Sequence, residues 1–104
     1  MANLAARGDS KDTVQTKHGC TSITTTDECS PNVFVGTGPT GIVRLGDKVH
    51  VHTFPPVLSC PSHQPPLTVA STTVLVNNRG AGRKGDLYIG EEIITGWPTV
   101  VIGG

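Results

Sequence analysis

The chain has 104 residues, of which 36% are hydrophobic and 4% aromatic, so any core is small and is built from aliphatic side chains. Basic and acidic residues number 8 each, and this zero net charge argues against nucleic acid or an anionic membrane surface as the main partner. Thirteen glycines and eight prolines favour turns, and helical periodicity is absent, so we expect an all-β domain.

The start of the chain, residues 1–10, has no apolar run, and we therefore expect no secretory signal peptide. No stretch approaches the length needed to span a membrane. The three cysteines are an odd number, which disfavours a complete disulfide framework and predicts folding in a reducing cytoplasm. Metal binding is then the better use for some of these thiols, because a small domain commonly needs a metal, disulfides or a partner.

A pattern of small residues, arginine and Gly-Asp occurs three times, and a valine-rich segment follows each copy. The aspartates of the three copies, 38 and 39 positions apart, are Asp9, Asp47 and Asp86. This spacing indicates repeated supersecondary units, in which we expect the aspartates to share one structural role. Each unit is too short to bury a core alone, so the three must pack on one another.

Several short segments are rich in β-branched residues and are bounded by Gly, Pro or Asn, which is typical of strands. The expected strands cover residues 22–25, 32–35, 73–77 and 92–96. Residues 36–41 and 77–80 supply turn chemistry for hairpins that lead into the next copy of the arginine pattern. Trp97, just before Pro98, is interpreted as a packing residue or a docking anchor.

The sharpest cluster of possible metal ligands is His50-x-His52 with Cys60-x-x-His63. Zinc prefers four nitrogen or sulfur ligands, and an extended backbone over residues 49–52 would place His50 and His52 on one face. The alternative is that all four histidines are ordinary surface residues on loops.

An enzyme is not expected. No serine lies in a nucleophile-elbow motif, and no histidine has a carboxylate partner nearby in the sequence. Glu91 and Glu92 are available as a general base, but nothing in the sequence places them near the histidines. A cell-adhesion role for Arg7-Gly8-Asp9 has little support, because the tripeptide is short.

The whole pattern resembles the PAAR-repeat family, small proteins that tip the spikes of contractile phage tails and type VI secretion systems. The family repeat runs Pro-Ala-Ala-Arg-x-Gly-Asp, then a His- or Cys-bearing insert, then Gly-Ser-Pro-x-Val-x-Val-Asn-Gly. All three copies here lack the proline, and the first lacks the residue between Arg and Gly. The resemblance implies a cone-shaped domain of three pseudo-symmetric β-hairpin repeats with a metal near the vertex. It spans residues 1–104, with repeats at about 1–40, 41–79 and 80–104, and implies no extension domain.

The family metal is usually held by three histidines and one cysteine of the third repeat. Here the position of that cysteine reads Ile89 or Gly90. Cys60 is therefore the expected replacement, with Cys20 and His50 as alternatives. The predicted ligands of one structural zinc ion, with iron as the alternative metal, are His18, His52, Cys60 and His63.

The resemblance also implies a mechanical function. One monomer would cap a trimeric β-helical spike through the segments around residues 35–38, 76–78 and 102–104, and would touch the target outer membrane transiently. No nucleic acid or small-molecule substrate is implied. The expected setting is the baseplate of a phage tail, assembled in the host cytoplasm. The alternatives are a type VI spike tip, which is made in the bacterial cytoplasm and then secreted, and a free metal-binding module with enzymatic activity.

Overall fold

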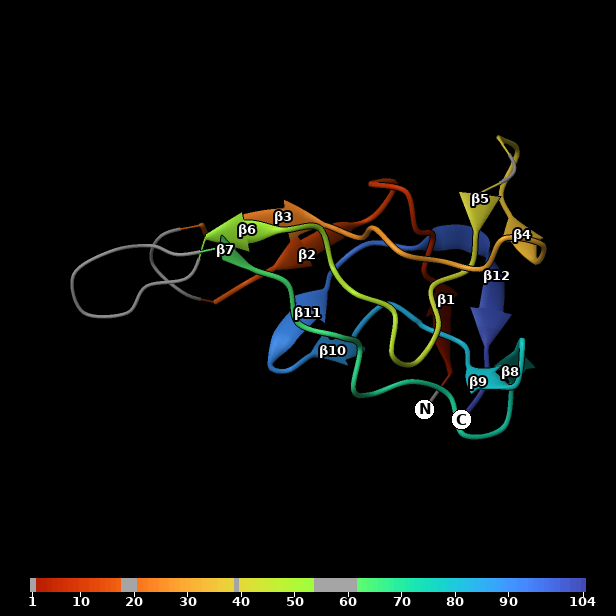
Figure 1. Ribbon diagram of the computed structural model, residues 1–104. Coiled ribbons are helices and arrows are strands. Elements are labelled where there is room, and N and C mark those ends of the chain that lie inside the picture. Colours follow the sequence, from red (N-terminus) through yellow and green to blue (C-terminus); the bar gives the residue numbers. More distant parts are fainter. Residues whose placement is uncertain (1, 18–20, 39, 54–61) are drawn as a thin grey trace.

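A computed structural model describes residues 2–17, 21–38, 40–53 and 62–104, and these ranges form a compact all-β domain without helices (Figure 1). The all-β expectation is thereby confirmed. These described residues include no helix that is long and apolar enough to cross a membrane. The strands are β1 (Asn3–Ala5), β2 (Thr13–Gln15), β3 (Ile23–Thr25), β4 (Phe34–Val35), β5 (Thr40–Gly41), β6 (His52–Thr53), β7 (Ser62–His63), β8 (Leu75–Val76), β9 (Arg79–Gly80), β10 (Leu87–Tyr88), β11 (Glu91–Ile93) and β12 (Trp97–Ile102).

The strands form one antiparallel sheet, in the order β10-β11-β2-β3, and four separate pairs. Three pairs, β4-β5, β8-β9 and β12-β1, lie at one end of the molecule, where both termini also lie (Figure 1). The fourth pair, β6-β7, lies at the opposite end. The molecule therefore has two distinct ends with the four-stranded sheet between them.

Three backbone hydrogen bonds join the segments that precede the arginines into a closed ring. The amide of Ala6 donates to Gly82, that of Gly82 donates to Val43, and that of Val43 donates to Ala6, at 3.0, 2.7 and 3.1 Å. A side chain at residue 82 would meet the carbonyl oxygen of Val43 at 3.0 Å, so this close approach favours glycine there. The three copies of the sequence pattern thus meet around one centre.

Each arginine of the pattern binds a buried aspartate by the same three hydrogen bonds. Arg44 donates from its amide and Nε to Oδ2 of Asp47 and from Nη2 to Oδ1, each at 2.9 Å. Arg83 binds Asp86 in the same way at 2.8 to 3.0 Å. These contacts couple the arginine to the turn that follows it.

In the first copy the assignment of Asp9 is wrong, because Arg7 binds Asp12 instead. The amide, Nε and Nη2 of Arg7 donate to the Asp12 carboxylate at 2.6, 3.2 and 2.9 Å. This hydrogen-bonded carboxylate raises the pKa of the Arg7 guanidinium. Asp9 is exposed and, with Ser10, adopts positive φ values of 52° and 62°. The loop after Arg7 is two residues longer than its counterparts, which moves the pairing aspartate along the chain.

Among the described residues, the buried hydrophobic side chains are aliphatic except for Tyr88, as the composition predicts. One cluster of buried side chains, which lies under the four-stranded sheet, contains Ala6, Val14, Val43, Val49, Leu67, Tyr88 and Ile93. The other, beneath the three strand pairs, contains Ala5, Val35, Ile42, Val76, Ala81 and Ile102. Trp97 packs against the second cluster, and its ring lies 5.3 Å from the Arg7 guanidinium.

Candidate metal centre

The β6-β7 pair places two histidines side by side. His52 and His63 are directly opposite each other in this antiparallel pair, so their side chains lie on one face. Their ring centroids are 4.8 Å apart, and the ring planes are almost perpendicular at 87°. The His52 side chain is buried, whereas that of His63 is about a quarter exposed.

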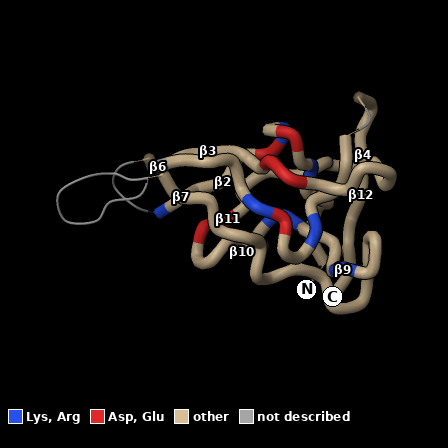
Figure 2. The backbone as a smooth tube through the Cα atoms, in the orientation of Figure 1, with Lys and Arg blue, Asp and Glu red and all other residues tan. Residues whose placement is uncertain are grey.

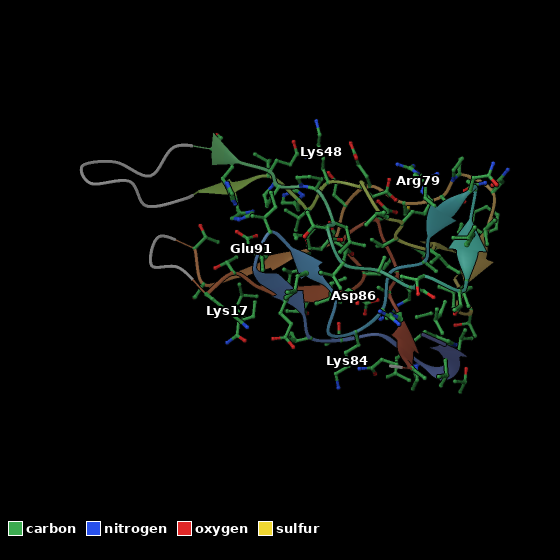
Figure 3. All side chains as sticks on the ribbon, turned by 90° about the horizontal axis from the view of Figure 1, so that it is seen from below. Lys17, Lys48, Arg79, Lys84, Asp86 and Glu91 are labelled. Atoms are coloured by element: carbon green, nitrogen blue, oxygen red, sulfur yellow. The ribbon has the colours of Figure 1, made fainter. Side chains whose placement is uncertain are left out.

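Glu91 brings a carboxylate to these rings from the four-stranded sheet. It is the first residue of β11, follows the two-residue turn Ile89–Gly90, and has a buried side chain. Its Oε2 atom lies 2.9 Å from Nε2 of His52 and 2.9 Å from Nε2 of His63. Figure 3 shows Glu91 between the β6-β7 pair and the sheet. Two elements distant in the chain therefore converge on one carboxylate oxygen.

The partners of the two ring nitrogens of His52 indicate which nitrogen carries the hydrogen. Nδ1 lies 2.8 Å from the carbonyl oxygen of His50, which can only accept, so Nδ1 carries a hydrogen. In the neutral ring, Nε2 then presents a lone pair to the Glu91 carboxylate, which is also an acceptor. Two acceptors at this distance are stable only with a proton or a cation between them. Metal-binding histidines commonly show this pattern, with one nitrogen on the metal and the other donating to a carbonyl.

The donor set and its dimensions fit a metal ion. The ligand atoms of His52, His63 and Glu91 all lie within 4.8 Å of one another. Around a tetrahedral zinc ion with bonds of about 2.0–2.2 Å, ligand atoms are about 3.4 Å apart. A small outward movement from the separations of 2.9 Å would admit such an ion. These three residues could therefore hold a metal ion.

The structure brings together two of the predicted ligands, His52 and His63. The other two predicted ligands, His18 and Cys60, lie outside the described residues, as does the alternative ligand Cys20. His50, the third alternative ligand, is exposed and lies outside this cluster of described residues, whereas His52 is buried within it.

Sequence reasoning did not assign Glu91 to this cluster. The signal that could have found it is its distance from the paired aspartate: Glu91 follows Asp86 by five positions, as His52 follows Asp47. Ile89 and Gly90, at the position that the resemblance assigns to the family cysteine, form the turn just before it. Its neighbour Glu92 instead forms an ion pair with Lys17 at 3.1 Å.

The described cysteine, Cys29, does not belong to this cluster. A side chain at Gly8 or Gly41 would meet its Sγ atom at 2.6 or 2.8 Å, so the thiol lies among the arginine-containing segments. Burial raises the pKa of this thiol, and the nearby carboxylates of Asp47 and Asp9 raise it further. Cys29 is therefore a packed, protonated thiol.

A comparison of the sequence with protein-family models found no match. A search of curated proteins found no significant relative either.

Proposed function

We propose that this chain is the structural tip of the central spike of a contractile injection machine, carried in the baseplate of a phage tail. The observation that carries the proposal is a set of apolar side chains exposed at matching places on three strands. Phe34 of β4, Leu75 of β8 and Val101 of β12 are 55, 60 and 63% exposed. The residues before them repeat the match at lower values, with Val33, Val74 and Val100 at 36, 37 and 36%. We call these six residues the apolar base.

The apolar base has the character of an interface with a three-fold partner. Exposed apolar patches on small soluble domains mark binding surfaces, and three matching positions in one chain suit three identical partner chains. The residues after the outer ones, Val35, Val76 and Ile102, are buried at 5% each, so they support the base from within. Strands β4 and β12 carry no charged residue, and charges lie mainly in the middle of the molecule (Figure 2). This favours a trimeric β-helical spike that binds one copy of the chain.

The opposite end supplies rigidity. There the candidate metal centre would link β6 and β7 to β11, segments that are separated in the chain by 28 residues or more. A structural zinc ion contributes on the order of 10 kcal/mol to folding, a large share for a domain with so small a core. We propose that the molecule narrows from the apolar base to this centre, and that the stiff narrow end pierces the target outer membrane. Zinc is the favoured metal and iron the alternative.

The same two surfaces would serve a type VI secretion spike. The two settings differ in where the protein is found: in purified virions for a phage tail, and in the culture medium for a secretion system. Neither setting requires catalysis, nucleic acid or a small-molecule substrate.

The experiment that tests the proposal is co-expression with the trimeric β-helical spike protein of the same genome. Leu75→Asp and Val101→Asp place charges in the apolar base and should abolish co-purification. Ile23→Asp is the matched control, because Ile23 is also exposed, at 51%, but lies on β3 away from the base. Equal spike binding by all three variants would exclude the apolar base as the docking surface.

A further inference from the structure

We infer that Glu91 is the anionic ligand of the metal centre, so that the ion is held by two imidazoles and a carboxylate in place of a thiolate. The inference relies on the metal centre of the proposed function but not on the spike. It concerns which atoms bind the ion and therefore which metals the chain accepts.

The first argument is the cost of burying Glu91. Its side chain is only 3% exposed, and a buried carboxylate is strongly destabilising unless a positive charge or several donors compensate it. Its Oε2 atom lies 2.9 Å from the Nε2 atoms of both His52 and His63. A divalent cation among these three ligand atoms would compensate the carboxylate, and it would bind the lone pairs that the two Nε2 atoms present when the rings are neutral.

The second argument is that the backbone positions Glu91 firmly. The turn before it contains Ile89 at φ 46°, a backbone conformation that β-branched residues rarely adopt. Such strain costs about 1–3 kcal/mol, and it persists only where the surroundings require it. Tyr88, which is opposite Glu91 in the register, is fully buried in the core and anchors the hairpin. The hairpin therefore holds Glu91 at a fixed place beneath the histidines.

The third argument concerns metal preference. Thiolates select soft metals, whereas imidazoles with a carboxylate suit borderline divalent ions such as zinc, iron(II) and cobalt(II). Two histidines and one carboxylate also occur as zinc and iron(II) ligand sets. A centre with this donor set would not depend on a reduced cysteine, so thiol oxidants should leave its metal in place.

Cobalt(II) bound to the full-length, metal-depleted chain provides the test, because thiolate ligands give it an intense near-ultraviolet charge-transfer band and carboxylates do not. We expect the unchanged chain to bind cobalt without this band. Glu91→Gln should weaken cobalt binding by about 100-fold or more, at least the size of the effects that supporting residues produce. Glu92→Gln, the matched control at the neighbouring ion pair with Lys17, should bind like the unchanged chain.

A positive signature covers the case in which Glu91→Gln fails to fold. Glu91→Cys should bind cobalt and gain the charge-transfer band, because position 91 then supplies a thiolate to the ion. The inference is overturned if the unchanged chain already shows the band and loses it in Cys60→Ser or Cys20→Ser. It is also overturned if Glu91→Gln binds cobalt normally, or if the unchanged chain binds none. Spike binding through the apolar base is measured separately, so either result can fail alone.

Discussion

At the residue scale, the three arginines matter because each one ties a backbone amide and a guanidinium to the same buried carboxylate. The Asp12 carboxylate also accepts a hydrogen bond from Thr95 Oγ1 at 2.8 Å, which connects the first arginine turn to the segment before β12. The arginine pattern was recognised in the sequence, but the partner of Arg7 was not. The sequence of the first copy offers Asp9 and Asp12 as possible partners of Arg7. Asp9 follows the glycine as the pairing aspartates of the other two copies do, so the sequence alone favours the wrong one.

Asp12→Asn should lower the free energy of unfolding by about 2 kcal/mol, because it removes the charge from hydrogen bonds to Arg7. Asp9→Asn makes the same chemical change at an exposed site and should cost less than about 0.5 kcal/mol. Urea unfolding followed by the fluorescence of the single tryptophan measures both. If Asp9→Asn were the more damaging variant, the assignment of Asp12 as the partner of Arg7 would be wrong.

At the element scale, the strands β3, β4, β8 and β11 lie within or beside the predicted segments, but they are shorter. For β4 and β8 the cause is visible at Ser30 and Ser71, whose hydroxyls accept from the amides of Val33 and Val74 at 2.9 Å. These amides are thereby withdrawn from strand pairing, a competition that local composition does not reveal.

The metal centre could be predicted only in part, for a reason that also lies in the elements. His52 and His63 were singled out because of their residue type and spacing. Glu91 and Glu92 are adjacent, and on a strand adjacent side chains point to opposite faces. Which of them meets the histidines depends on the register set by the turn at Ile89, and the sequence does not specify that register.

The turn after β4 offers a test of how the base is built. Gly36 has a φ of +91°, and a side chain there would meet the Trp97 ring at 3.4 Å. Gly36→Ala should therefore cost about 1 kcal/mol or more in the free energy of unfolding. Gly38→Ala in the same turn has no positive φ and nothing within 4 Å, so it should be neutral or slightly stabilising. Thermal unfolding of the two variants would contradict this packing if Gly38→Ala were the less stable.

At the scale of the whole molecule, we propose that one end binds the spike and that the other end is stiffened by a metal ion. The ring of backbone hydrogen bonds and the three arginine–aspartate pairs hold three strand pairs at one end, where the apolar base is exposed. The candidate metal centre lies at the other end, where it would join segments that share little apolar core. On the function that we propose, one chain would present three matching contacts to a trimer and a stiffened point to a membrane.

The most direct measurement of this account is native mass spectrometry of the chain co-purified with the trimeric spike protein. The account predicts one copy of the chain for three spike chains, with one metal ion retained. A complex with three copies of the chain per trimer, or no complex at all, would contradict the spike-tip function.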